Sequence, residues 1–177
     1  MIALNMKIPD VKVFVPDIHE DKRGYFYESF RANWLPSVEF VQDNHSLSSK
    51  KTLRGLHYQL KNPQGKLVRV IRGAVFDVAV DLRKSSEFFG KWIGRTISQE
   101  NREIFWVPPG FAHGFLVLTD HAEFVYKCTS YYAPEDEHTL AWSDPEVGID
   151  WPGDSLPPIL SDKDKNAVSF KDCPAYP

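Results

Sequence analysis

Cysteine is scarce in this chain, and long apolar runs and basic blocks are absent. The 177 residues include two cysteines, Cys128 and Cys173, which lie far apart and form no Cys-x-x-Cys motif. The sequence therefore predicts neither a disulfide framework nor a zinc site, and we expect reduced thiols. No apolar run approaches the roughly 18 residues of a membrane span, and no charged-then-apolar signal pattern opens the chain. We expect a cytoplasmic protein with no membrane segment.

Charge is nearly balanced, with a formal net charge of -3 and a pI near 6.1. Because Lys and Arg are dispersed along the chain, the sequence gives no basic surface typical of nucleic-acid binding. An anionic substrate would need a locally basic pocket. A length of 177 residues fits one domain, which we expect to span 1–177.

Hydrophobic residues recur with period two, which is typical of strands. In residues 74–83, Phe76, Val78, Val80 and Leu82 alternate with Asp77, Ala79, Asp81 and Arg83, which predicts a strand with one apolar face. Shorter runs of this kind occupy residues 11–15, 25–30, 40–46, 67–71, 92–98, 104–107, 115–118 and 123–129. Helix signals are confined to residues 30–35 and to a possible capping box from Ser161 to Asp164. The pattern predicts an all-β sandwich or barrel with short peripheral helices and an irregular tail from about residue 151.

A small β-sandwich leaves edge strands whose unpaired backbone groups must be covered. A dimer would cover these edges. The N-terminal strands are the natural candidates for exchange between two subunits, so we expect a homodimer.

Two histidine motifs stand in this β-rich sequence. His57 ends Arg54-Gly55-Leu56-His57, close to the Lys66 of Gly65-Lys66-Leu67-Val68, and an imidazole beside an ammonium suggests carbon-acid chemistry. The second motif, from Pro108 to Phe115 and containing His113, resembles the second motif of the cupin superfamily. A metal-binding cupin would place another His two residues after the first, but His57 is followed by Tyr58 and Gln59, which are poor metal ligands. We expect a double-stranded β-helix (jelly-roll, cupin) barrel that holds no metal.

Seven ordered segments together resemble the dTDP-4-dehydrorhamnose 3,5-epimerase family. They include Arg54-Gly55-Leu56-His57-Tyr58-Gln59 and lie at residues 23–28, 40–46, 53–59, 64–70, 76–81, 110–115 and 126–127, within a match over about residues 8 to 165. The resemblance implies a cofactor-free epimerase of dTDP-L-rhamnose biosynthesis. It would invert C3 and C5 of dTDP-4-keto-6-deoxy-D-glucose and yield dTDP-4-keto-L-rhamnose.

The resemblance also implies roles for individual residues. His57 would be the base, Asp164 the carboxylate that orients it, Lys66 the group that stabilises the enolate, and Tyr126 the acid on the opposite side. The residues implied to bind substrate are Arg23, Glu28, Gln42, Asp43, Asn44, Arg54, His113, Tyr132, Glu137 and Lys163. Arg23 and Arg54 would hold the diphosphate, Tyr132 would stack on thymine, and Arg23 and Glu28 would serve the neighbouring subunit if the N-terminal strands exchange.

The sequence leaves several alternatives open. Asp164 could simply belong to the capping box, and Lys66 and Tyr126 could be an ordinary solvated lysine and a core tyrosine. In a regular strand, Arg54 and His57 would project to opposite faces, so either Gly55 marks a bulge or Arg54 reaches round from a strand end. The chain could also be a single-site epimerase, a metal-dependent cupin oxygenase or a non-catalytic nucleotide-sugar binding protein.

Overall fold

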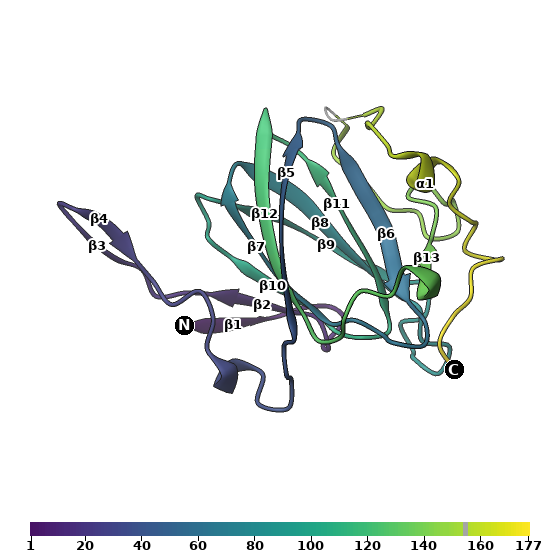
Figure 1. Cartoon of the computed structure of the whole chain (residues 1–177), viewed down its shortest axis with the longest axis horizontal. Coiled ribbons are helices and arrows are strands. Elements are labelled where there is room, and N and C mark those ends of the chain that lie inside the picture. The colour runs from purple at the N-terminus through teal and green to yellow at the C-terminus, as the bar shows by residue number, and fades with distance from the viewer. Residues whose placement is uncertain (154–155) are drawn as a thin grey trace.

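Two antiparallel sheets pack face to face in the structure, a computed structural model that describes residues 1–153 and 156–177 (Figure 1). The six-stranded sheet has the order β1-β2-β10-β7-β12-β5, with bounds Ile2–Asn5, Lys12–Val15, Ile104–Val107, Lys66–Arg72, His121–Cys128 and Gln42–Ser49. The five-stranded sheet has the order β13-β6-β11-β8-β9, with bounds Glu137–Thr139, Leu53–Gln59, Phe111–Val117, Ala74–Asp81 and Trp92–Ser98. The prediction of an all-β jelly roll is confirmed, although the two sheets are not joined into a closed barrel.

The space between the sheets is filled by alternate side chains of both. Val68 of β7 and Phe124 of β12 meet Val75 of β8 and Phe115 of β11 in one buried cluster. Phe115 and Phe124 stack with ring centroids 4.1 Å apart. Each such buried side chain stabilises the folded state by ~1.5–3 kcal/mol, so this layer holds the two sheets together.

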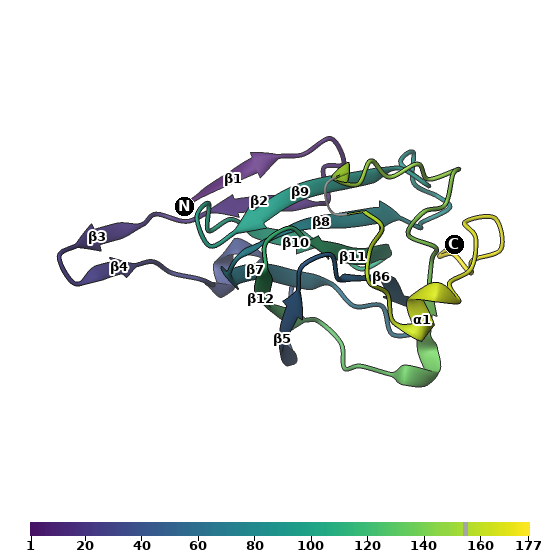
Figure 2. The ribbon, with the colours of Figure 1, turned by 90° about the horizontal axis from the view of Figure 1, so that it is seen from above.

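The outer face of the five-stranded sheet is buried as well, which corrects the prediction of one apolar face in residues 74–83. Val78 and Val80 of β8 pack against Leu140, Val147 and Trp151 of the C-terminal segment. This segment also carries the short helix α1 (Asp162–Lys165), which lies beside β6 in both views (Figures 1 and 2). Because the tail covers one face and the other sheet covers the opposite face, Asp77 and Asp81 are buried too, each with 0% exposure.

Most predicted strands are present with shifted ends. Residues 92–98 and 104–107 coincide with β9 and β10, whereas β11 begins at Phe111, before the predicted residue 115. The predicted strand 25–30 is limited to β4 (Gly24–Phe26), which pairs with β3 (His19–Asp21) in an arm that extends away from the body (Figure 1). The predicted helix 30–35 is a 3₁₀ turn, η1 (Ala32–Trp34), and a second one, η2, spans Pro134–Asp136.

No helix in residues 1–153 and 156–177 is long and apolar enough to cross a membrane.

Candidate active site

A cavity of about 710 Å³ opens between the two sheets, where the edge strand β5 faces β6 and β13. The six-stranded sheet lines it from β5, β7 and β12, and the five-stranded sheet lines it from β6, β11 and β13; α1 and the residues before it form part of the rim. Eleven of the predicted site residues line this one cavity: Gln42, Asn44, Arg54, His57, Lys66, His113, Tyr126, Tyr132, Glu137, Lys163 and Asp164. Residues far apart in sequence are thus brought together.

A bulge in β6 explains how both Arg54 and His57 reach the cavity. His57 pairs with His113, but Arg54 pairs with Phe115, so three steps along β6 oppose two along β11. Gly55 stands at this irregularity with φ +130°, and a Cβ there would come within 2.6 Å of the Gly114 Cα atom. The interpretation of Gly55 as the mark of a bulge is confirmed.

His57 and Asp164 form a close pair. The His57 Nε2 atom lies 2.6 Å from Asp164 Oδ1, and Ser161 Oγ donates to Asp164 Oδ2 over 2.7 Å. Ser161 also caps α1 by accepting from the Asp164 backbone N–H. The N-cap formed by Ser161 and the histidine contact therefore coexist, because α1 holds the Asp164 carboxylate next to the ring.

Electrostatics favours a neutral His57 and an ionised Asp164. Burial lowers the pKa of His57, although the hydrogen bond to Asp164 acts in the opposite direction. Burial would raise the pKa of Asp164, but hydrogen bonds from His57 and Ser161 outweigh it and hold the pKa below its ordinary value. At neutral pH the Nε2–H group then donates to the carboxylate, and Nδ1 carries a lone pair that can accept a proton.

Lys66 and Tyr126 face His57 from the opposite sheet, on the neighbouring strands β7 and β12. Burial lowers the pKa of Lys66, while Cys128, Glu137 and Asp77 oppose this shift. Burial raises the pKa of Tyr126 to about 12, so its phenol stays protonated at neutral pH. Within the described ranges, no hydrogen bond or ion pair occupies the Lys66 ammonium or the Tyr126 hydroxyl, which leaves both available to a ligand.

A hydrogen-bonded group lies at the rim of the cavity. Glu137 Oε2 accepts from Lys163 Nζ at 2.7 Å and from Tyr132 Oη at 2.9 Å. Gln42 Oε1 accepts from the Tyr132 backbone N–H at 2.9 Å, and Gln42 Nε2 donates to Asn44 Oδ1 at 3.0 Å. These contacts hold the exposed Tyr132 ring at the mouth.

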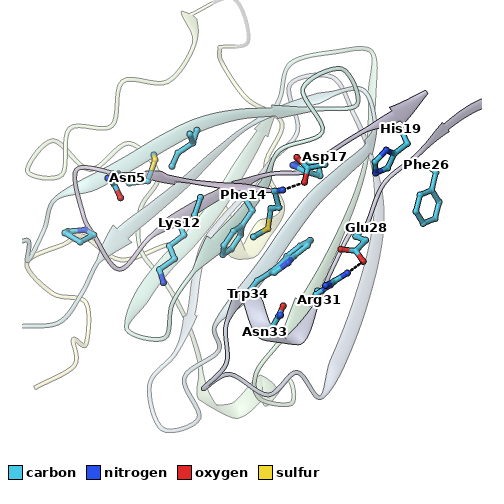
Figure 3. A pocket seen from close by; sticks show the side chains of 16 residues that line it. Asn5, Lys12, Phe14, Asp17, His19, Phe26, Glu28, Arg31, Asn33 and Trp34 are labelled. Carbon is cyan, nitrogen blue, oxygen red and sulfur yellow. Dashed lines mark hydrogen bonds and ion pairs between the residues drawn. The ribbon is translucent and has the colours of Figure 1, made fainter. Parts of the chain in front are cut away.

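Three predicted residues lie elsewhere in this chain. Asp43 alternates with Gln42 and Asn44 on β5, so it faces away from the cavity and pairs with Lys127 at 2.9 Å. Arg23 pairs with Asp21 at 2.5 Å on the β3–β4 arm. Glu28 pairs with Arg31 in a larger hollow of about 960 Å³ between β1, β2 and the segment that follows the arm (Figure 3).

The hollow in Figure 3 contains few groups free for chemistry. Its ion pairs join Glu28 to Arg31 and Asp17 to the chain's N-terminal ammonium, and within each pair the two charges neutralise each other (Figure 3). In the smaller cavity between the sheets, by contrast, burial is the main cause of the shifted pKa values of His57, Lys66 and Tyr126, which is the pattern of an active site. We therefore take the cavity between the sheets as the site.

Two polar residues of this cavity region are not among the predicted site residues. Ser46 lines the cavity, and its hydroxyl is buried with no hydrogen-bond partner in the part of the chain that the structure describes. The spacing of Ser46 from Gln42 and Asn44 could have indicated that Ser46 lines the cavity, because all three share one face of β5. Asp77 lies behind His113, with Oδ1 2.8 Å from His113 Nε2. In the sequence, alternation places Asp77 on the polar face of its strand, and nothing in the pattern indicates that this polar face is buried.

No group of three or more His, Cys, Asp or Glu side chains that could hold a metal ion occurs among the described residues.

Comparison with known proteins gives one consistent match. The family model for dTDP-4-dehydrorhamnose 3,5-epimerase matches residues 5–172. A dTDP-4-dehydrorhamnose 3,5-epimerase from Pseudomonas aeruginosa is 50% identical, with all of both chains covered. A crystal structure of a 3,5-epimerase from Legionella pneumophila, in complex with dTDP-4-keto-L-rhamnose, has a TM-score of 0.93 and 48% identity, covering 97% of this chain and 94% of that one.

A 3'-monoepimerase from Streptomyces bikiniensis, solved with dTDP-quinovose, shares the fold with a TM-score of 0.88 at 37% identity, covering 94% of this chain and 86% of that one. The fold alone therefore does not separate double from single inversion. The full-length matches at about half identity are nevertheless to 3,5-epimerases, and the chain belongs to the dTDP-4-dehydrorhamnose 3,5-epimerase family.

Proposed function

We propose that this chain is an isomerase that inverts C3 and C5 of dTDP-4-keto-6-deoxy-D-glucose and gives dTDP-4-keto-L-rhamnose, a step of dTDP-L-rhamnose biosynthesis. The observation that carries the proposal is one cavity with a carboxylate-held His57 on one sheet and Lys66 and Tyr126 on the other. A carbon next to a ketone loses a proton readily only if a base is in place and the enolate oxygen is stabilised. The cavity offers both, and an acid on the opposite wall.

His57 is the base in this proposal. Its neutral ring takes the proton from the carbon at Nδ1, because Nε2 is bound to Asp164. The imidazolium that forms is then stabilised by the ionised carboxylate, and Ser161 fixes the position of that carboxylate. Asp164 acts through His57 and is a positioning residue.

Lys66 stabilises the enolate and Tyr126 returns the proton. An ammonium in a cavity with little water interacts more strongly with a developing negative oxygen than it would in solvent. The raised pKa of Tyr126 keeps its proton available for transfer. Since His57 and Tyr126 stand on facing sheets, a sugar between them can lose a proton from one side and gain one from the other.

The nucleotide end of the substrate binds at the rim. Arg54 lies exposed at the cavity with its Nε bonded to Ser48 at 3.0 Å, and no other residue that the structure describes bonds its terminal nitrogens, which leaves them available to a diphosphate. Tyr132 offers a flat ring for thymine, and Gln42, Asn44, Glu137 and Lys163 supply polar contacts to base or sugar.

A homodimer completes the proposal. The β3–β4 arm carries Arg23 and stands clear of the body, and the following segment carries Glu28, so a second subunit could receive both (Figure 2). We assign Arg23 and Glu28 to the neighbouring subunit's site. Both cysteines are free, which fits the cytoplasm as the place where the dimer works.

Replacing Arg54 with alanine is expected to raise KM by about tenfold or more while kcat changes little, because a diphosphate contact persists from ground state to transition state. Steady-state kinetics and calorimetric titration with dTDP would measure both. Arg72→Ala is the matched control, since Arg72 lies on β7 outside the cavity. Unchanged dTDP affinity in Arg54→Ala would contradict this assignment.

The function is tested by incubating the protein with dTDP-4-keto-6-deoxy-D-glucose and identifying the product stereochemistry by NMR. Inversion at both carbons, unaffected by a strong chelator, is the expected result. Inversion at one carbon would identify a single-site epimerase. Loss of turnover on chelation with recovery on metal addition would favour the metal-dependent alternative, and binding without turnover would favour a non-catalytic module.

A further inference from the structure

The cavity contains two histidine–aspartate pairs rather than one. His113 lies opposite His57 in the register of β11 and β6, and its Nε2 atom is 2.8 Å from Asp77 Oδ1. In both pairs the carboxylate binds Nε2, so each ring has only Nδ1 left for a ligand. Neither Nδ1 atom makes a hydrogen bond to another residue within 1–153 and 156–177, and neither is among the fully buried atoms that lack a partner. Both rings line the cavity.

The two carboxylates differ at their second oxygen. Asp164 Oδ2 accepts a hydrogen bond from Ser161 Oγ at 2.7 Å. Asp77 Oδ2 is buried with no hydrogen-bond partner among the described residues, and the Asp77 side chain has 0% exposure. A carboxylate anion that is buried with one bare oxygen is costly, whereas one with donors on both oxygens is stable.

The pKa directions agree with this geometry. Burial raises the pKa of Asp77, and the opposing effects of His113 on β11 and Lys66 on β7 do not cancel it. The pKa of Asp164 instead lies below its ordinary value, because hydrogen bonds outweigh its burial. The pKa values of the two carboxyl groups are therefore shifted in opposite directions, which is how one site obtains both a base and a donor.

We infer that the His113–Asp77 pair retains a proton that the His57–Asp164 pair lacks, so that His113 presents Nδ1–H to the cavity as a hydrogen-bond donor. Asp77 is the positioning residue that keeps it in this form. Under the proposed function, on which this last assignment rests, the acceptor is the enolate oxygen of the substrate, shared with Lys66.

The proton count supports a donor in either arrangement of the pair. With a neutral Asp77, the acid O–H donates to Nε2 and the ring proton sits on Nδ1; with an ionised Asp77, the imidazolium carries protons on both nitrogens. Both arrangements have zero net charge and expose Nδ1–H. Removing the proton would leave a net negative pair beside a developing enolate, which electrostatic repulsion disfavours.

The direct test is the tautomer of each histidine in the folded wild-type protein, read from nitrogen-15 NMR of the imidazole rings near neutral pH. His113→Gln and His57→Gln assign the two signals, and circular dichroism checks their folding. We expect His113 Nδ1 to be protonated and His57 Nδ1 to be bare. A bare His113 Nδ1 would overturn the inference. Because no substrate is needed, this result is independent of whether the chain is an epimerase.

A pair of matched variants gives a second readout. In Asp77→Asn the amide can donate to Nε2 as the neutral acid does, so kcat should fall by less than about tenfold. In Asp164→Asn the lost anion should lower kcat by ~10²–10⁴. Thermal unfolding verifies that both variants are folded. If Asp77→Asn is folded and as inactive as Asp164→Asn, an Nδ1–H donor kept by the amide does not sustain turnover, and the assignment of this donor to the enolate oxygen is wrong.

Discussion

Replacing His57 with alanine is expected to lower both solvent exchange at the substrate's α-carbons and net epimerisation by ~10²–10⁴, the usual contribution of a general base. The effect should be on kcat, because the ring acts on the reacting carbon and contributes little to nucleotide binding. Deuterium uptake and product formation, measured on the same samples, give both rates.

His121→Ala is the control for this experiment, since His121 is exposed at the start of β12 and lines no part of the cavity. It should behave as wild type. A His57→Ala protein that still exchanges deuterium at nearly the wild-type rate would mean that another group is the base, and His113 on the adjacent strand would be the first to examine.

Removing the Tyr126 hydroxyl should separate the two halves of the reaction. In Tyr126→Phe, proton removal by His57 is intact, so solvent exchange should continue while net inversion is lost or misdirected. Core packing should be little affected, because the hydroxyl has no partner among the described residues and the ring still packs on Phe124 at 5.7 Å. Product stereochemistry by NMR, alongside deuterium uptake, measures both steps.

Tyr131→Phe serves as the matched control, because the Tyr131 side chain is 70% exposed and lies outside the cavity lining. If Tyr126→Phe epimerises both carbons at the wild-type rate, the proton is returned by water or by another side chain.

Local patterns were sufficient for several strands of the two main sheets. β9 and β10 coincide with the predicted ranges, since hydrophobic residues mark their buried positions. β1 and β13 were not predicted, because neither has buried apolar positions that mark it, and each is defined by pairing with another strand, β2 and β6 respectively. Their existence depends on tertiary contacts that period two does not report.

The site was less accessible to sequence reasoning than the fold. The grouping of His57 with Asp164, 107 positions apart, came from resemblance and not from any local pattern. The Gly55 bulge was one of two readings of an odd spacing, and only the pairing of β6 with β11 decides it. Asp77 received no role because a charged residue in an alternating strand is expected to face solvent, and here the second sheet covers it.

The most direct test of the account is a single incubation of dTDP-4-keto-6-deoxy-D-glucose with the wild-type protein in heavy water, followed by NMR of the sugar. Proton abstraction next to the C4 ketone predicts deuterium at both C3 and C5, with inverted configuration at each. Product formation with no deuterium at either carbon would contradict the mechanism, because inversion would then occur without exchange of a proton.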